Sequence, residues 1–182
     1  PELSGKRLEL LKETVPALAR VAVFGTPNHP GNAQNLRETK IVAEAFRISL
    51  QYLEVLSPKD IETAFQALSK ERSDAVIALG SFVQVNQRTQ IAALAIKSHL
   101  PAMYPQSEFV EAGGLMSYGV NRNDMARRAA TYVDKILKGT KPAGLPVEQA
   151  TKFEFIVNLK AANQIGLKIP PNVLARADRV IR

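Results

Sequence analysis

The sequence predicts an α/β fold, a three-layer sandwich in which helices cover both faces of a mainly parallel sheet. Short apolar segments rich in β-branched residues alternate along the chain with amphipathic helical segments. One of them, Asp74–Leu79, contains an unbroken apolar run, which is typical of a parallel strand buried on both faces. Hydrophobic residues make up 46% of the 182 residues, enough to bury a core.

The first third of the chain predicts a helix, a strand and a second helix. Ser4 can cap the first helix, and apolar residues follow it at helical spacing as far as Leu18. The apolar, β-branched run Arg20–Phe24 predicts a strand. It leads into Gly25–Asn32, a loop dense in turn-forming residues, and the next helix is expected over Ala33–Ile48.

The alternation of strand and helix then continues. Gln51–Val55 predicts a second strand, and Ser57–Asp60 opens a helix with proline in its first turn, where the missing N–H of proline costs nothing. Asp74–Leu79 is the third strand. Gly80–Phe82 ends that strand, and a helix rich in Ala, Ile and Leu runs to about Ser98.

The second half of the chain predicts three more strands and four helices. A long helix, capped by Asn121 or Asn123, ends at Gly139. Residues 140–151 contain proline and glycine without periodicity, which predicts an extended connector. The other expected elements are the strands Pro101–Tyr104, Leu115–Gly119 and Phe153–Val157, the short helices Gln106–Ala112 and Leu159–Ile165, and a terminal helix from Pro170-Pro171 through Leu174 and Ala177.

Composition narrows the class of protein. The net charge is +7, but lysine and arginine are spread along the chain without a basic cluster, which indicates a solvated surface and not a nucleic-acid site. The chain has no cysteine, which excludes disulfides and thiol chemistry and fits an oxidising compartment. No apolar run approaches the ~20 residues of a membrane span. The first residue is Pro1, and no signal peptide is present, so we expect a piece of a longer protein.

The glycines and histidines do not form a cofactor or metal site. Gly25 and Gly31 lack the spacing of a dinucleotide fingerprint, and no phosphate-binding lysine follows them. His29 and His99 each stand alone, without the acidic or histidine neighbours of a metal site. We therefore expect neither a metal nor a cofactor.

The candidate catalytic groups also have structural explanations. Ser81 lacks a nucleophile elbow and a base partner, so it is better suited to cap a helix or to donate a hydrogen bond to a ligand. Glu108 and Glu111 lie three residues apart on a short helix, which is typical of a solvated helix face. We expect no enzymatic activity.

Three loops at the carboxyl ends of strands form the expected working surface, because ligands of open parallel sheets bind there. These loops are Gly25–Asn32, Gly80–Gln84 and Tyr104–Ser107. They carry neutral donors, acceptors and aromatic rings, which suit a small polar or aromatic solute. These residues, each of which could instead have a structural role, are Asn28, His29, Asn32, Ser81, Phe82, Gln84, Tyr104 and Gln106. All except Gln106 are predicted ligand contacts.

A family resemblance covers nearly the whole chain. Seven segments carry it in order: Pro101–Pro105, Phe109–Gly119, Ala130–Gly139, Leu145–Gln149, Thr151–Lys160, Gly166–Pro171 and Leu174–Asp178. In these segments the chain strongly resembles the ABC transporter substrate-binding protein family that includes the tryptophan/tyrosine-type binding proteins. The resemblance implies a type I periplasmic-binding-protein fold, in which two α/β lobes hold the ligand between them.

The resemblance implies that this chain is the C-terminal portion of such a protein. It carries one complete lobe and part of the other. The implied division is an inter-lobe helix over 1–19, the second lobe over 20–112, a strand, helix and hinge connector of the first lobe over 113–150, and a return to the second lobe over 151–182. By position, the resemblance also adds Ser117 and Tyr118 to the ligand contacts.

The implied function is capture of a solute, an amino acid or an aromatic or related compound, and its delivery to a membrane permease. Family members that bind amino acids often have an acidic residue where this chain has Ser81–Gln84, so a less charged solute is equally expected. The implied location is periplasmic or extracytoplasmic, with a signal peptide and a lipid anchor in the full-length form as further hypotheses. An apolar face on Leu115–Gly139 suggests a homodimer. The effector domain of a transcription regulator shares the fold and is the alternative.

Overall fold

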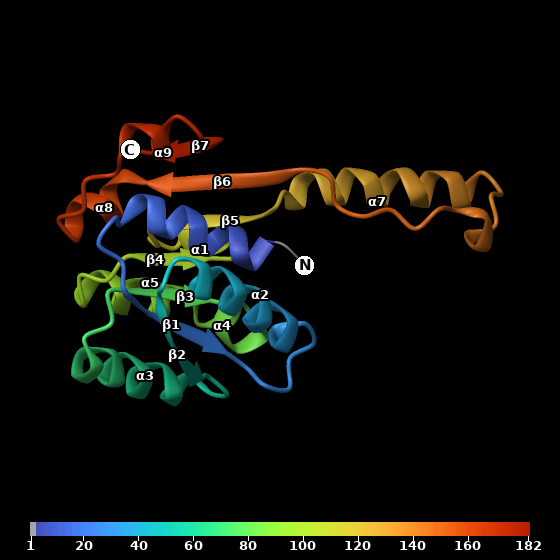
Figure 1. The fold of residues 1–182 in the computed structure, drawn as a ribbon. Helices are drawn as coiled ribbons and strands as arrows, with labels where there is room; N and C mark the ends of the chain where they lie inside the picture. Colours follow the sequence, from blue (N-terminus) through green and yellow to red (C-terminus); the bar gives the residue numbers. More distant parts are fainter. Residues whose placement is uncertain (1–2) are drawn as a thin grey trace.

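The computed structural model describes residues 3–182, which contain one seven-stranded sheet (Figure 1). The strand order is β2-β1-β3-β4-β5-β6-β7. The strands are β1 Arg20–Gly25, β2 Ser49–Glu54, β3 Ala75–Ala78, β4 Ala102–Tyr104, β5 Met116–Val120, β6 Phe153–Asn158 and β7 Arg179–Ile181. The first five in spatial order are parallel, β6 runs antiparallel to β5, and β7 is parallel to β6. The predicted α/β class with a mainly parallel sheet is confirmed.

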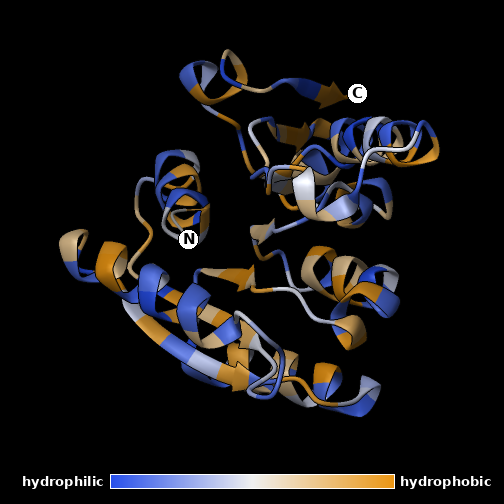
Figure 2. Ribbon diagram, turned by 90° about the vertical axis from the view of Figure 1, so that its right-hand side faces the viewer, coloured by the Kyte–Doolittle hydropathy of each residue, from blue (hydrophilic) through white to orange (hydrophobic). Residues whose placement is uncertain are grey.

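Helices cover both faces of this sheet. They are α1 Leu3–Thr14, α2 Asn32–Ala45, α3 Pro58–Glu71, α4 Phe82–Asn86, α5 Arg88–Lys97, α6 Ser107–Glu111, α7 Arg122–Leu137, α8 Leu159–Gln164 and α9 Pro171–Leu174, with a 3-10 turn at Pro142–Gly144. Buried side chains of α1, α8 and α9 share one hydrophobic core, and those of α3, α5 and α6 share the other. The helices carry hydrophobic and hydrophilic residues in alternation (Figure 2), as expected for elements that each bury one side.

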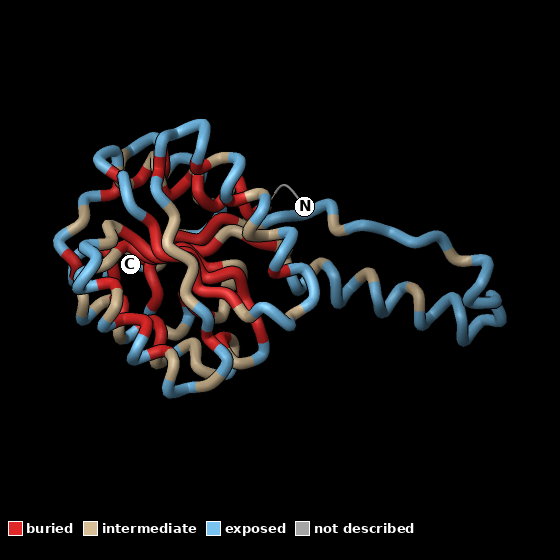
Figure 3. The backbone as a smooth tube through the Cα atoms, turned by 60° about the horizontal axis from the view of Figure 1, so that its bottom comes forward, coloured by how far each residue is buried: buried red, intermediate tan, exposed pale blue. Residues whose placement is uncertain are grey.

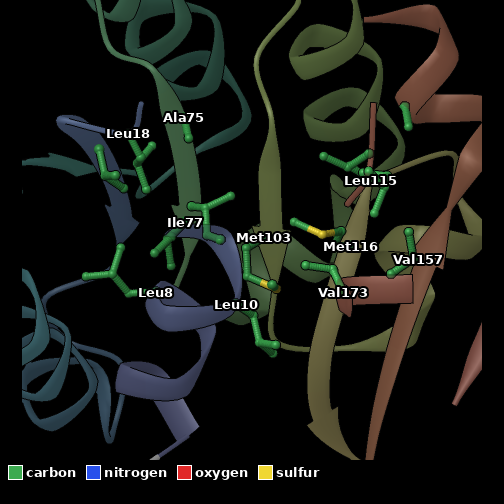
Figure 4. Close-up of a cluster of buried hydrophobic side chains, with 14 of the residues drawn as sticks. Leu8, Leu10, Leu18, Ala75, Ile77, Met103, Leu115, Met116, Val157 and Val173 are labelled. Atoms are coloured by element: carbon green, nitrogen blue, oxygen red, sulfur yellow. The ribbon is translucent and has the colours of Figure 1, made fainter. Parts of the chain in front are cut away.

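Alternate residues of each central strand belong to the two cores. Val21 and Val23 of β1 lie in the core that Figure 4 shows, whereas Ala22 and Phe24 lie in the other. Because successive side chains of a strand point to opposite faces, a strand covered on both sides must be apolar at every position. This explains the unbroken apolar runs of the sequence.

Residues 121–152 form a projecting arm that stands out from the rest of the molecule, which we call the body (Figures 1 and 3). The arm consists of α7 and the connector that runs back beside it. No residue of α7 is buried. Tyr132 Oη donates to Pro146 O at 2.7 Å, which ties the helix to the connector.

Charged groups close the base of the arm. Asn121 N donates to Lys152 O at 3.0 Å, where the chain leaves and re-enters the body. Lys152 Nζ lies 3.0 Å from Asp124 Oδ1, and Arg128 Nε lies 3.2 Å from Asp124 Oδ2. These two cations, Lys152 foremost, hold the pKa of the Asp124 carboxyl below its usual range.

Several sequence-based boundaries need correction. Ser4 lies inside the first turn of α1 and accepts a hydrogen bond from Arg7, so it does not cap that helix. The expected helix up to Ser98 is two helices, α4 and α5, and the expected terminal helix ends at Leu174 instead of Ala177. The strand β7 was not predicted.

The division into lobes remains a prediction, with one adjustment. The strand β5, expected to leave the second lobe with α7, is hydrogen-bonded to β4 within the sheet of the body. The helix α1 packs on that same sheet through Leu8, Leu10 and Leu11. Residues 1 and 2 of the expected inter-lobe helix lie outside the described residues.

The close approach of β5 to the loop after β4 gives a test of this fold. A Cβ at Gly119 would lie 2.0 Å from Pro105 O, so Gly119→Ala must push the two segments apart. We expect a loss of about 1–3 kcal/mol in the free energy of unfolding. Urea denaturation measures this loss. Gly144→Ala, where a Cβ meets nothing within 4 Å, is the control, and an equal effect of both changes would contradict the packing described here.

Candidate functional site

A hollow of about 780 Å³ lies at the carboxyl ends of the parallel strands, between the body and the base of the arm. Its volume falls in the range of small-molecule sites. Helices α1 and α2, the segments after β3 and β4, the end of β5 and the start of α7 all contribute to it. The lining residues are Leu3, Arg7, Asn35, Leu79, Pro105, Gln106, Val120, Arg122, Asn123, Met125, Ala126 and Ala129.

Asn32 joins two of the three predicted loops. Its Oδ1 accepts from Thr26 N at 2.8 Å, and its Nδ2 donates to Gly80 O at 2.9 Å. Thr26 Oγ1 also lies 2.9 Å from Ser81 Oγ. The Asn32 side chain is buried, so it shapes the loops beside the hollow instead of facing a solute.

Ser81 and Gln84 have structural roles at the start of α4. Ser81 Oγ accepts a hydrogen bond from Gln84 N at 3.3 Å and so caps the helix. Helix capping was one of the two roles predicted for Ser81. Gln84 Oε1 accepts from Gly80 N at 3.0 Å. Both side chains are buried, so neither contacts a solute in this conformation.

Asn28, His29 and Phe82 are the predicted contacts of the first two loops that are not buried: Asn28 and Phe82 are exposed, and His29 is half-buried with its Nδ1 3.2 Å from Asn32 Nδ2. The rings of His29 and Phe82 meet edge to face, with centroids 5.9 Å apart. Phe82 is 81% exposed, which is unusual for a phenylalanine in a folded protein. None of the three lines the hollow, but all are accessible enough to contact a solute or a second lobe, and we keep them as candidates.

Tyr104 and Ser117, both predicted ligand contacts, lie inside the body. They are paired residues of β4 and β5, and both are almost fully buried. The Tyr104 ring stacks on Phe109 at 4.8 Å, and burial raises the pKa of its hydroxyl above the ordinary value. Side-chain alternation along β4 directs Tyr104 into the core under α6. Neither residue reaches the hollow in this conformation.

Tyr118 lies on the opposite side of β5. Its backbone carbonyl accepts from Arg7 Nε at 2.7 Å, and its ring lies near Phe153. The ring lines a second hollow, of about 960 Å³, between α1, α2 and the end of the arm. That hollow is not bordered by the strand-end loops, so we favour the first as the solute site.

Four polar or charged residues of the hollow were not identified from the sequence, and Gln106 was considered but not predicted as a ligand contact. The four are Arg7, Asn35, Arg122 and Asn123. Asn35 lies one turn inside α2, directly behind a predicted loop, and this spacing could have identified it. Arg7 and Arg122 come from α1 and the arm, whose placement beside the strand ends depends on the tertiary fold.

Two other kinds of feature are absent from the described part of the chain. Within residues 3–182, no three His, Asp or Glu side chains gather to hold a metal ion. No helix of the same residues is both long and apolar enough to cross a bilayer.

The comparison with family models identifies one family. The sequence model described as ABC transporter substrate binding protein matches residues 2–181. No curated protein sequence matches this chain.

Solved structures share the fold over almost the whole chain. A conserved domain protein from Vibrio cholerae is 30% identical over 97% of this chain, with a TM-score of 0.85. A domain from Streptococcus pneumoniae in complex with L-Trp is 23% identical over 98%, with a TM-score of 0.86. A substrate binding protein from Clostridium difficile, in its ligand-free, open structure, is 19% identical over 97%, with a TM-score of 0.72. This chain spans only about three fifths of those proteins, namely 60%, 62% and 59%.

The role of Asn32 can be tested by substitution. Asn32→Ala leaves Thr26 N and Gly80 O without their partner and also removes the contact of Asn32 Nδ2 with His29 Nδ1. We expect the free energy of unfolding to fall by about 1–3 kcal/mol. Asn28→Ala, at an exposed position of the same loop, should change it by less than about 0.5 kcal/mol. Thermal or chemical denaturation compares the two variants. A stable Asn32→Ala protein would contradict the structural role.

Proposed function

The chain belongs to the family of ABC transporter substrate binding proteins, and we propose that it holds one lobe of a two-lobed protein that captures a small solute and delivers it to an ABC permease. The hollow at the strand ends carries this proposal. One wall is the body and the other is the base of the arm, and its remaining side is open. A second lobe built on the arm would complete it.

The arm supports the presence of that lobe. Val133 and Leu137 are 54% and 82% exposed, on a helix that buries none of its residues. A helix with such an exposed apolar face normally packs on a partner. We choose the first lobe as this partner because this chain covers only about three fifths of its structural relatives, which are longer. The comparisons give no support to a pair of identical chains.

The solute class follows from the amide and apolar side chains of the lining and from the relatives. Asn35, Gln106 and Asn123 present amide donors and acceptors, while Leu79 and Met125 present apolar surface. This mixture suits a small solute with polar and apolar parts. The Streptococcus pneumoniae structure contains L-Trp, so we propose an amino acid or a related aromatic compound.

The proposed mechanism is closure of two lobes. A solute binds first to the body, and rotation at the base of the arm brings the other lobe over it. The solute binds the closed form more strongly than the open form, and this difference in affinity determines how far the equilibrium shifts toward the closed form. The permease would then recognise the closed shape. The proposal assigns no chemical step to the protein, in line with a family whose members generally carry solutes without transforming them.

The family also indicates the location. Proteins of this family are typically extracytoplasmic, and we propose the same location for this one, with a lipid anchor as a further hypothesis. No observation favours the effector domain of a transcription regulator, because the family match covers residues 2–181.

Solute binding is testable by thermal shift on the full-length protein against amino acids and aromatic compounds. A solute at 100 times its Kd should add about 2.7 kcal/mol to the free energy of unfolding. Gln106→Ala and Asn35→Ala should each weaken binding by about 2–10-fold through a lost hydrogen bond. Gln34→Ala, at an exposed position of α2, is the matched control. If neither variant differs from the control, the site lies elsewhere.

The partner of the arm is tested by placing charges at Val133 and Leu137. In residues 1–182 alone both positions are exposed, so Val133→Glu with Leu137→Glu should change the free energy of unfolding by less than about 0.5 kcal/mol. In the full-length protein the same change should cost about 2 kcal/mol or more, because the charges would be buried.

Thr131→Glu, on the opposite side of α7, controls for charge. Equal behaviour in the two lengths of protein would contradict packing by a first lobe. Light scattering on the short form would detect self-association through the same face.

A further inference from the structure

The floor of the hollow carries a buried guanidinium. Arg7 of α1 is 5% exposed and lines the hollow. Its Nε donates to Tyr118 O at 2.7 Å, and its Nη1 lies 3.1 Å from Ser4 Oγ. Both acceptors are neutral. Within residues 3–182, its Nη2 makes no hydrogen bond, although a guanidinium carries five N–H donors.

Arg7 forms no ion pair with any residue of 3–182. Desolvation lowers the pKa of Arg7 to about 10, while Tyr118 and Glu38 act in the opposite direction. The guanidinium therefore stays protonated at neutral pH. The Glu38 carboxylate makes no ion pair with it among the described residues, lies beside the second hollow, and accepts instead from Gln34 Nε2 at 2.8 Å. A buried cation with this little compensation favours an anionic partner.

The other ionisable group of the hollow is also positively charged. Its ionisable lining residues are Arg7 and Arg122, and none is acidic. Arg122 Nη1 lies 3.0 Å from Glu108 Oε1, but Glu108 does not line the hollow, and the Arg122 side chain is 62% exposed. Asn35 and Gln106 add neutral amides. An anion placed here would meet two guanidinium groups and no carboxylate on the wall.

We propose that Arg7 determines the specificity of this hollow by binding an anionic group of the solute, a carboxylate in the first place. A guanidinium can bind both oxygens of a carboxylate in one plane, which a lysine cannot do. This inference rests on the proposed function and narrows it to solutes that carry a carboxylate. The competing explanation is that Arg7 only ties α1 to β5 through the Tyr118 carbonyl.

The test compares each acid with its primary amide, which has nearly the same shape but no charge. Calorimetry on the full-length protein measures the Kd of amino acids and aromatic carboxylates and of their amides. We expect each acid that binds to do so at least about tenfold more tightly than its amide. Arg7→Met should remove most of this preference, whereas a purely structural arginine would weaken acid and amide equally. Arg37→Met, at an exposed position of α2, removes the same charge elsewhere and should leave the preference intact.

Two further variants keep the test decisive if Arg7→Met does not fold. Arg7→Lys retains the charge but not the planar fork, so it should lose several-fold in affinity for acids and little for amides. Arg122→Gln, at an exposed position, should reduce the preference for acids more weakly.

The experiments distinguish failure of the proposed function from failure of the role proposed for Arg7. If no solute raises the melting temperature, the proposed function fails and this inference fails with it. If solutes bind but acid and amide have the same Kd, or if Arg7→Lys and Arg7→Met leave their ratio unchanged, only this inference is overturned.

Discussion

The antiparallel pairing of β5 with β6 is the constraint on which the rest of the structure depends. It runs over five residue pairs, from Met116↔Val157 to Val120↔Phe153. Because the two strands are neighbours, the chain leaves the body and returns to it at one place. The arm must therefore start there, and its base becomes the second wall of the hollow. The same pairing holds the Tyr118 carbonyl where Arg7 reaches it.

The sheet was predictable from the sequence because its signals are local. The segments Arg20–Phe24 and Asp74–Leu79 are apolar at nearly every position, as a strand with helices on both sides requires. Elements whose stability comes from distant contacts gave no such signal. The strand β7 has only three residues and exists through its pairing with β6, more than twenty residues earlier in the chain. Ser4 also has the residue type of a helix cap, but Arg7 engages its hydroxyl from inside the helix.

The sequence predicted where the site lies but not which side chains line it. The rule that ligands bind at the carboxyl ends of parallel strands selected three loops. One of them, Tyr104–Ser107, contributes Pro105 and Gln106 to the hollow, and the other two lie beside it. Polarity alone could not distinguish a residue that builds a loop from one that faces the solute. Asn32 is polar and lies in the right loop, yet its buried amide contacts Thr26, Gly80 and His29 of the protein itself. Arg7 lies 111 residues from its partner Tyr118, and no local pattern reveals that contact.

The two halves of the hollow differ in rigidity, and this difference suits a protein that closes on its ligand. Arg7 lies in a helix packed on the central sheet, so its guanidinium is held in place before any solute arrives and little side-chain entropy remains to be lost. Arg122 and Asn123 lie at the first turn of the arm, where the exposed Arg122–Glu108 ion pair is a weak attachment to the body. A solute bound to the rigid floor can therefore gain contacts from the movable wall at small cost. This asymmetry gives the proposed closure its direction: the body would hold the solute, and the arm would carry the proposed second lobe onto it.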